Sequence, residues 1–552
     1  RVSVESSLEP WIRLRTVGLV PCELPWRDEH DSNVLRTTPG LYPDPLYPAE
    51  LPADDRTVGE RTAGDAATLC GAHLPEPAGA TAGVVAFPGQ WRSVWVTVDF
   101  AAGSPATTRR SESGDRSRAP RPEAGVHPVS IHFDSQAGER LASASVELEV
   151  IDAALPPQRL SCTEWFHTDC LATAYGVEVW SEDHWRRIEQ YMDSAVRHGV
   201  TMILTPVFTP PLDTAVGGER PTVQLVDVNV DSEGRYEFGF DRLNRWVDVA
   251  NRVGLRSFEI SHLFTQWGAQ HCPKIVATVD GRERRIFGWD TSATGDEYKA
   301  FLDAFLPALV RFLQERDLAE RAAFHVSDEP RLEHLDQYRA ARQLVEGHLR
   351  DFPIMDALSN YEFYERGVVD LPIPASNHIE PFIDGGVKPL WTYYCVGQKV
   401  DVANRFFAMP SARNRVLGAQ LYAFDVDGFL QWGLNFWYSQ FSVRPVNPFL
   451  NTDAGYAFPS GDAFLVYPGV DGPIDSIRYE VFREALQDLR ALRLLEALVG
   501  RAKTKALLED VTVPGADPDL QPITFSRYPQ SDEWLLSVRE RVNQAIKHAA
   551  RP

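Results

Sequence analysis

The pattern that most constrains the fold is an alternation of short apolar runs with polar, helix-forming stretches between residues 160 and 437. Stretches such as 182–199 and 297–316 place apolar residues at helical spacing. Strands that alternate with helices in this way are typical of a parallel α/β fold. The apolar runs are at 160–167, 201–208, 257–264, 322–329, 353–360, 373–380, 389–396 and 428–437. Eight such units predict a (β/α)8 TIM-like barrel, although the fifth to seventh connections are short or irregular.

The region before the barrel has a different texture. Residues 1–155 are rich in Pro and Gly and contain short β-type runs with partial alternation, which predicts an antiparallel β-sandwich. The runs are at 91–100, 129–133 and 144–151. Between them, residues 101–125 have almost no apolar side chains and predict a flexible surface loop. Residues 154–158 then predict a linker.

The domain limits follow from these patterns. We expect an N-terminal β-sandwich domain over 1–155 and a catalytic barrel over 156–470. Residues 476–510 have strong helical periodicity, so 471–552 are predicted to be a C-terminal helical segment packed on the barrel.

Composition narrows the classes of partner. The formal net charge is -22, and such a surface repels phosphate backbones, so no nucleic-acid partner is predicted. No apolar run reaches the length of about 20 residues that spans a bilayer, and the first residues contain no basic-then-apolar leader. The sequence therefore predicts no membrane partner and a cytoplasmic location. Since the first residue is not Met, a leader removed from the chain remains compatible with the sequence.

Cysteine usage predicts reduced thiols. Six cysteines are too few for a disulfide scaffold at 552 residues, and no pair has the C-x-x-C spacing. Cys162, His167 and Cys170 are metal-ligand types without metal-ligand spacing. The chain also lacks a P-loop, a dinucleotide fingerprint, H-E-x-x-H and G-x-S-x-G. No metal and no cofactor are predicted.

The stretch Phe324–Pro330, FHVSDEP, places two carboxylic acids where an apolar run ends. In a barrel the active site lies at the carboxyl ends of the strands. Two adjacent carboxyl groups repel each other as anions, which favours one protonated member. We therefore predict that Asp328 and Glu329 are catalytic and that Glu329 is the proton donor.

Other polar and aromatic residues follow the predicted strands and would line the same mouth. Aromatic rings stack on the apolar faces of sugars, and amides bind their hydroxyl groups. Such a collection predicts a carbohydrate site, and Trp165 and Asp213 are also found at strand ends. The predicted sugar contacts are His262, Gln266, Trp267, Asn360, His378, Trp391, Tyr393, Trp432 and Asn435.

The adjacency of the two acids favours one mechanism. Most glycosidases place two carboxyl groups on either side of the scissile bond, which neighbours in sequence cannot easily do. Neighbours suit substrate assistance, in which the 2-acetamido oxygen of the sugar attacks the anomeric carbon. One carboxylate then orients the amide N–H, and the other protonates the leaving group and later activates water.

Several longer motifs resemble glycoside hydrolase family 123. In order they are FHVSDEP with LTPVFTPPLDT (204–214), GGERPTVQLVDV (217–228), FEISHLFTQWGAQHCPKI (258–275), FGWDT (287–291), WTYYCVG (391–397), DGFLQWGLNFW (427–437), DAFLVYPG (462–469) and DSIRYEVFREALQDLRALRLL (475–495). The resemblance runs from about residue 164 to 495. It implies an N-terminal β-sandwich, a (β/α)8 barrel and a retaining exo-β-N-acetylgalactosaminidase. It also implies that Asp328 orients the acetamido group and that Glu329 is the acid/base.

Two alternatives remain open from the sequence. A glycosidase of the same fold could act on a different sugar or linkage, since no residue here fixes the axial 4-hydroxyl group. A non-catalytic carbohydrate-binding protein on the same barrel is the other alternative. The expected partner in each case is a carbohydrate, in the first instance a glycan with terminal β-linked GalNAc, and assembly into a homo-oligomer is left open.

Overall fold

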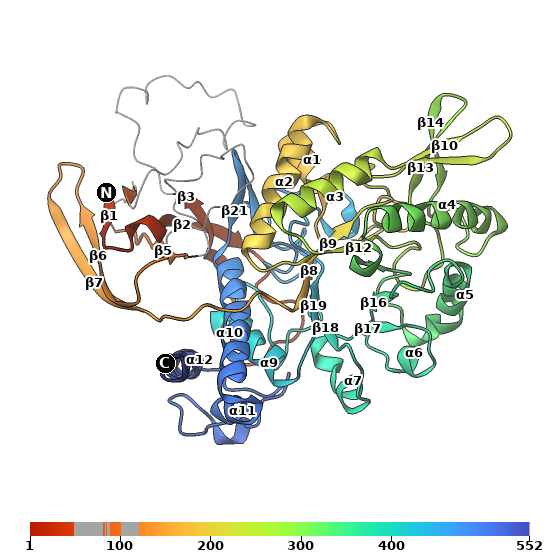
Figure 1. Ribbon diagram of the computed structural model, residues 1–552. Coiled ribbons are helices and arrows are strands. Elements are labelled where there is room, and N and C mark those ends of the chain that lie inside the picture. Colours follow the sequence, from red (N-terminus) through yellow and green to blue (C-terminus); the bar gives the residue numbers. More distant parts are fainter. Residues whose placement is uncertain (49–80, 83, 85–88, 101–120, 551–552) are drawn as a thin grey trace.

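The computed structural model describes residues 1–48, 81–82, 84, 89–100 and 121–550. Within these ranges the chain is a mixed α/β protein. Antiparallel sheets form the N-terminal region, and parallel strands surrounded by helices form the larger part (Figure 1). Most of the loop predicted over 101–125 lies outside the described residues.

The N-terminal region contains two antiparallel sheets, with strand orders β4-β1-β6-β7 and β3-β2-β5. Apolar residues from both sheets, such as Leu14 and Val129, belong to one buried cluster. Each of the predicted β-type runs falls on a strand, so the antiparallel prediction is confirmed. The strands are β1 (Val2–Glu5), β2 (Ile12–Cys22), β3 (Gly40–Pro48), β4 (Thr81–Ala82), β5 (Val94–Val98), β6 (Gly125–Asp134) and β7 (Arg140–Val150).

The larger part is built on a parallel six-stranded sheet of order β15-β12-β9-β8-β19-β18, and two further strands, β16 and β17, pair with each other. Most of these strand residues are buried, as is typical of parallel strands covered on both faces. All eight predicted runs meet a strand, although the run at 373–380 touches only Ile373. The strands are β8 (Ser161–Glu164), β9 (Met202–Thr205), β12 (Ser257–Ile260), β15 (Ala322–Phe324), β16 (Met355–Ala357), β17 (Leu371–Ile373), β18 (Trp391–Tyr393) and β19 (Gly428–Gln431).

The β16–β17 pair approaches both edges of the six-stranded sheet. An isolated parallel bridge joins Phe324 of β15 to Ile354, the residue before β16. Another joins Ala375, which follows β17, to Tyr393 of β18. The continuous sheet is therefore a parallel half-barrel, and the remaining pair lies between its ends.

Helices separate the parallel strands, and their ends carry the expected signals. Ser181 caps α2 by accepting a hydrogen bond from the His184 N–H. Gly254 ends α3 in the left-handed conformation, with φ of 104°. The predicted helices at 182–199 and 297–316 coincide with α2 and α4. The helices of this part are α1 (Thr168–Tyr175), α2 (Glu182–Arg197), α3 (Asp241–Val253), α4 (Asp296–Glu315), α5 (Leu335–Glu346), α6 (Glu362–Glu365), α7 (Glu380–Asp384), α8 (Ser411–Arg415) and α9 (Leu417–Ala423).

The C-terminal segment is helical, as its periodicity predicts. It contains α10 (Ile477–Val499), α11 (Arg501–Leu508) and α12 (Asp532–Ala549). Gly500, with φ of 88°, separates the first two, so the predicted stretch 476–510 is two helices rather than one. Helix α10 lies between the N-terminal sheets and the parallel strands (Figure 1).

Two β elements of the larger part are absent from the sequence-based expectations. A four-stranded sheet of order β11-β10-β13-β14 is formed by the segments after β9 and β12, and β20 pairs with β21 as a hairpin. Strand β14 is largely exposed and rich in arginine, so no apolar run marks it. The strands are β10 (Asp227–Val230), β11 (Tyr236–Gly239), β13 (Ile275–Val279), β14 (Arg282–Phe287), β20 (Val466–Gly469) and β21 (Gly472–Asp475).

Buried ion pairs join the N-terminal region to the larger part. Arg15 of β2 binds Asp475 at 3.1 Å and also pairs with Glu480 of α10. Asp44 of β3 accepts from Arg478 of α10 at 2.9 Å. These charges are buried on both sides, so separating the two parts would leave them without partners.

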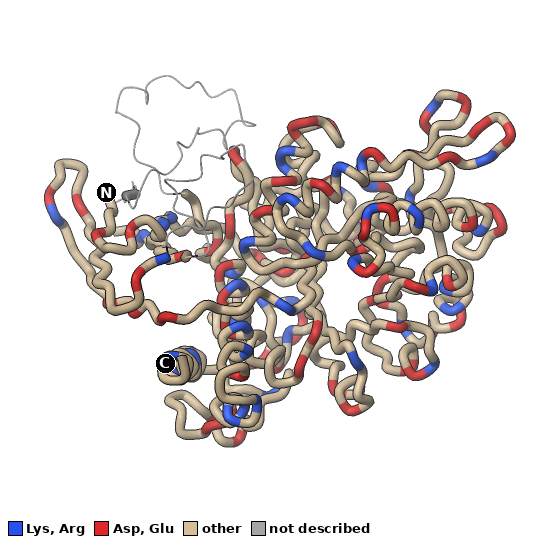
Figure 2. The backbone as a smooth tube through the Cα atoms, in the orientation of Figure 1, with Lys and Arg blue, Asp and Glu red and all other residues tan. Residues whose placement is uncertain are grey.

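The charged residues form no segregated blocks along the described chain (Figure 2), and the described cysteines form no disulfide bonds. Acidic and basic residues are interspersed along the backbone (Figure 2). Among the described residues, no helix combines the length and apolar character needed to cross a membrane. The cysteines within the described ranges are free thiols, namely Cys22, Cys162, Cys170, Cys272 and Cys395.

Candidate active site

A cavity of about 220 Å³ opens at the carboxyl ends of the parallel strands. Its walls come from residues at or after the ends of β8, β9, β12, β15, β16, β18 and β19, as expected for a site at the strand ends. One wall residue, Arg27, comes from the N-terminal region. The lining residues are Arg27, Trp165, Leu212, Asp213, Gln266, Trp267, Asp328, Glu329, Ala357, Tyr393, Cys395, Val396, Leu430, Trp432, Gln440, Phe441 and Phe458.

Asp328 and Glu329 both line this cavity, although neighbours on a strand point to opposite faces. The alternation is broken because β15 ends at Phe324 and Glu329 adopts the left-handed conformation, with φ of 44°. Two backbone bonds hold this turn. The Glu329 N–H donates to the Ala357 carbonyl at 3.0 Å, and the Trp267 N–H donates to the Asp328 carbonyl at 2.8 Å. A strained turn that presents two acids to one cavity is typical of a functional site.

Glu329 is anchored through one carboxyl oxygen. The Tyr393 hydroxyl donates to Oε1 at 2.6 Å, and the Cys395 thiol lies 3.8 Å from the same atom. Burial and the Glu329 charge raise the pKa of Tyr393 well above its usual value, so Tyr393 remains a phenol that donates. Among the described residues, none hydrogen-bonds to Oε2, which leaves that oxygen free to exchange a proton with a ligand.

Asp328 differs from Glu329 in that no described residue hydrogen-bonds to its carboxyl group. Burial raises its pKa well above the usual value, the charge of Glu329 raises it further, and the charge of His325 opposes both. Asp328 is therefore protonated more readily than an exposed aspartate.

Four of the predicted sugar contacts lie in the cavity wall, namely Gln266, Trp267, Tyr393 and Trp432. Trp267 is 38% exposed and meets Phe441 edge-on at 5.9 Å. Gln266 accepts from the Asp213 N–H at 2.6 Å. The Trp432 indole donates to Asp462 at 2.9 Å, and burial raises the pKa of that aspartate to about 7.

The other five predicted sugar contacts do not line the cavity. Trp391 begins β18, at the opposite end of the strand, and its ring packs where a side chain at Gly428 would lie. Asn435 is fully buried and exchanges two hydrogen bonds with the His167 backbone, at 2.9 and 3.0 Å. His262 is buried below the cavity floor with its ring stacked on His325 at 4.3 Å.

Asn360 and His378 lie beyond the ends of β16 and β17. Asn360 precedes α6, where its carbonyl accepts from the Phe363 N–H at 3.2 Å. His378 is exposed in a short 3-10 turn. The connections here are the short ones of the fold, so a residue a few positions past the strand has already turned away from the mouth.

The cavity wall includes residues absent from the predicted sugar contacts. Asp213 supplies a third carboxyl group, and burial raises its pKa to about 6. It accepts the Phe441 N–H at 2.9 Å, which fixes the segment that carries Phe441 over the cavity. Its place at the end of the second predicted run was a usable signal. No sequence signal connects Arg27, Phe441 or Phe458 with a strand end.

Among the described residues, two buried groups contain metal-ligand residue types, and both are already engaged. In the first, the His325 side chain hydrogen-bonds to Asp356 at 2.9 Å and to Glu259 at 2.6 Å, and the His262 ring stacks on His325. The second group is His198, Asp475 and Glu480. There both carboxylates bind Arg15. The donor sets fit ion pairs better than a metal centre.

We expect Tyr393→Phe to lower kcat/KM by about 10- to 100-fold, because a hydrogen bond to a charged group contributes about 1.5–3 kcal/mol. The variant removes the donor that fixes Glu329 and leaves the ring in place. The assay is the initial rate on the substrate that the wild type turns over fastest. Tyr438→Phe is the matched control. The Tyr438 hydroxyl hydrogen-bonds to Thr173 at 3.0 Å, and Tyr438 does not line the cavity. An unchanged rate for Tyr393→Phe would show that Glu329 is oriented without it.

Comparison with known proteins gives one family. Residues 165–495 match the family described as glycoside hydrolase 123, catalytic domain. This match covers more than half of the chain and includes every parallel strand except β8. No curated protein matched the chain.

Among the solved structures compared with this chain, one supports the fold and the others are more distant. A family 123 glycoside hydrolase from Clostridium perfringens, studied for glycolipid glycan hydrolysis, is 15% identical with a TM-score of 0.66, over 99% of this chain and 88% of that one. A β-D-glucuronidase from Dictyoglomus thermophilum is 8% identical with a TM-score of 0.34, over 67% of this chain and 60% of that one. A β-galactosidase from Bacillus circulans is 10% identical with a TM-score of 0.33, over 61% and 56%.

Proposed function

Because the chain belongs to glycoside hydrolase family 123 and so acts on glycosidic bonds of carbohydrates, we propose that it is an exo-acting, retaining β-N-acetylgalactosaminidase. The observation that carries the proposal is the pair of adjacent acids facing one cavity, one anchored and one free. A free carboxylate beside an anchored acid suits a reaction in which the sugar supplies the nucleophile.

In the first step the acetamido oxygen of the bound sugar attacks the anomeric carbon. Glu329 gives its proton to the glycosidic oxygen, the C–O bond breaks, and the aglycone leaves. Asp328 accepts the acetamido N–H and offsets the positive charge of the oxazolinium intermediate. The amide donor of the bound sugar favours the anion on Asp328, and Glu329 is the member of the pair that donates the proton.

In the second step water attacks the anomeric carbon from the side that the aglycone left. Glu329, now a carboxylate, accepts a proton from this water, and the acetamido group is released. Two displacements at one carbon give net retention. The aromatic wall, Trp267, Trp432 and Phe441, supplies rings for the apolar faces of the sugar and aglycone.

The architecture that we propose for this reaction is a closed (β/α)8 barrel over 156–470, with a β-sandwich over 1–155 and helices over 471–552. The bridges at Phe324 and Tyr393 support closure, because they join β16 and β17 to the two edges of the half-barrel. The apolar cluster shared by the two N-terminal sheets supports a sandwich.

The test uses the 4-nitrophenyl β-glycosides of GalNAc, GlcNAc and galactose. We expect hydrolysis of the GalNAc substrate and none of the galactose substrate, which has no acetamido group. Asp328→Asn should lower kcat by about 100- to 1,000-fold, since it removes charge stabilisation of the intermediate. GalNAc-thiazoline, a mimic of the oxazolinium, should inhibit the wild type.

Other outcomes separate the alternatives. Equal or faster hydrolysis of the galactose substrate would refute substrate assistance. Activity on another N-acetylated sugar alone would keep the mechanism and change the sugar. Sugar binding without turnover on a panel of aryl α- and β-glycosides would indicate a binding protein.

A further inference from the structure

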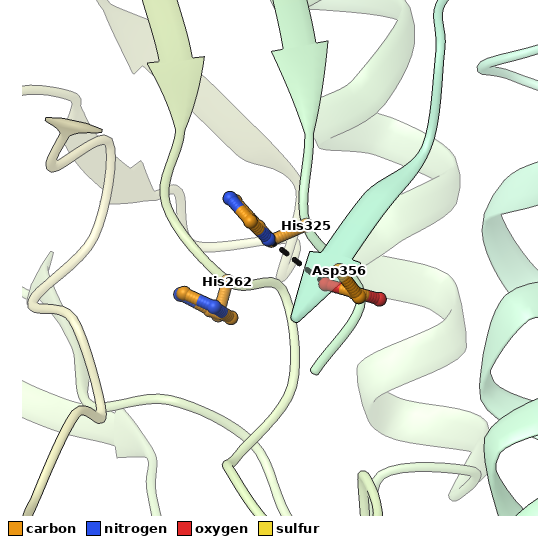
Figure 3. Close-up of side chains that lie close together, drawn as sticks. All are labelled: His262, His325 and Asp356. Carbon is orange, nitrogen blue, oxygen red and sulfur yellow. Dashed lines mark hydrogen bonds and ion pairs between the residues drawn. The ribbon is translucent and has the colours of Figure 1, made fainter. Parts of the chain in front are cut away.

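Below the cavity floor, His325 is held between two buried carboxylates. Its Nε2 lies 2.6 Å from Glu259 of β12, and its Nδ1 lies 2.9 Å from Asp356 of β16. All three side chains are fully buried. Since both ring nitrogens face carboxylate oxygens, both carry protons, and His325 is an imidazolium. Figure 3 shows its ring directed at Asp356 with His262 alongside.

The surroundings keep this cation in place. Burial alone would lower the pKa of His325, but its hydrogen bonds to Asp356 and Glu259 and their charges raise it to about 10. The Tyr338 hydroxyl of α5 donates to Asp356. The backbone N–H groups of Val326 and Ser327 donate to the same carboxylate, each at 3.3 Å.

His262 is an uncharged member of the same buried group. We call this group of His325, Glu259, Asp356 and His262 the chamber. Burial and the neighbouring His325 charge lower its pKa well below the usual value. Its ring stacks on His325 with centroids 4.3 Å apart, and its nitrogens have no hydrogen-bond partner among the described residues. The role that this placement fits is packing against the cation.

His325 is linked to the catalytic pair by charge and by structure. It stands three residues before Asp328 on the same strand end. The cation acting on Asp328 is His325, whereas Glu329, Asp356 and Glu259 act on it as anions. Without His325, four carboxyl groups would share one water-poor region, and the carboxylate form of Asp328 would be disfavoured further.

The chamber also fixes the cavity floor. Glu259 accepts from the Trp165 indole at 2.6 Å and from the Thr163 hydroxyl at 2.6 Å. Trp165 lines the cavity. The imidazolium therefore orients, through Glu259, a ring that a bound sugar would contact.

We propose that His325 is a positioning residue: a buried imidazolium whose charge favours the carboxylate form of Asp328, while Glu329 acts as the proton donor. This inference rests on the proposed function, because it assumes that the active pair holds one proton. It assigns a role in catalysis to three residues, His325, Glu259 and Asp356, that do not touch the substrate.

The first test is the pH profile of kcat/KM, on whichever aryl glycoside the wild type hydrolyses fastest, so that the identity of the sugar does not matter. His325→Gln keeps a planar polar group without the charge. We expect kcat to fall by about 100-fold with KM changed by less than about threefold, and both limbs of the profile to move up by about 1 pH unit.

Removal of a neighbouring anion is the control against a merely structural role, because it should shift the pH profile in the opposite direction. Glu259→Gln removes an anion, so its profile should move to lower pH, and the double variant should lie between the two single ones. His262→Phe keeps the stacked ring and should leave the profile in its wild-type position. A fall in kcat with no movement of the limbs in either single variant would overturn the proposal.

The second test does not depend on activity. In the full chain labelled with ¹⁵N-histidine, one doubly protonated imidazole should persist at pH 9 and be lost in His325→Gln. A neutral His325 at pH 8 would overturn the proposal even if Asp328 and Glu329 prove catalytic. Conversely, activity that survives Asp328→Asn would refute the proposed function and leave the imidazolium measurement valid.

Discussion

Glu329→Gln is expected to lower kcat/KM on the 4-nitrophenyl substrate by about 10²- to 10⁴-fold, the usual contribution of a positioned general acid. This corresponds to about 3–5 kcal/mol of transition-state stabilisation. Glutamine keeps the shape and can still accept from Tyr393, but it has no proton to give and cannot activate water. The loss should be greatest for alkyl or sugar aglycones and least for 2,4-dinitrophenyl, which leaves without protonation.

Azide sharpens this test, because it is a nucleophile that needs no base. With the 2,4-dinitrophenyl substrate, azide should restore turnover of Glu329→Gln and give the β-glycosyl azide, detected by mass spectrometry and NMR. Glu333→Gln is the matched control, since that side chain is four residues away and 69% exposed. A Glu329→Gln enzyme of wild-type activity would remove Glu329 from the mechanism.

Arg405→Met is expected to be the most destabilising single substitution considered. Arg405 is fully buried, and its Nη1 binds both oxygens of Glu164, at 3.0 and 2.8 Å. Its Nη2 donates to Gln431 and to the Gly433 carbonyl. Removing it leaves Glu164 charged, buried and unpaired, which costs about 3–5 kcal/mol. Equilibrium unfolding in urea, or the thermal midpoint if unfolding is irreversible, measures the change.

The control for Arg405→Met is an exposed Arg–Glu pair in which both carboxylate oxygens are also bound. Arg252 donates to both oxygens of Glu189, at 2.9 and 3.0 Å, and is 53% exposed. Arg252→Met should cost less than about 1 kcal/mol. The double variant Arg405→Met with Glu164→Gln should recover much of the loss, because it removes the unpaired charge. Equal effects of the buried and exposed variants would contradict this account.

The parallel strands were predictable because strands buried on both faces are continuous apolar runs in the sequence. The runs at 201–208 and 257–264 contain β9 and β12. The place of Asp328 and Glu329 in the cavity wall was predictable for the same reason, since they follow such a run. The left-handed turn at Glu329 that directs both acids into the cavity has no marker in the sequence, because the position is not glycine.

The other residues of the cavity wall were harder to predict, because a position at a strand end does not fix the direction of the side chain. Trp391 and Tyr393 are two positions apart on one short strand, yet Trp391 packs at its start and Tyr393 reaches Glu329. Asn435 has an amide that could bind a sugar hydroxyl group, but its oxygen and nitrogen both hydrogen-bond to the backbone of His167. His262 is a buried histidine in the chamber, and its ring stacks on His325. The cation that organises this chamber is invisible in sequence, since Glu259 and Asp356 come from separate strands.

Arg27 contributes to the cavity wall from a segment more than 100 residues before the first parallel strand. The same segment is tied to the loops over the cavity, where the Ser460 N–H donates to the Leu24 carbonyl at 2.9 Å. The N-terminal region is therefore part of the cavity and not a separate module. Replacing it with the corresponding region of another enzyme would change one side of the cavity, so we expect the two regions to evolve together.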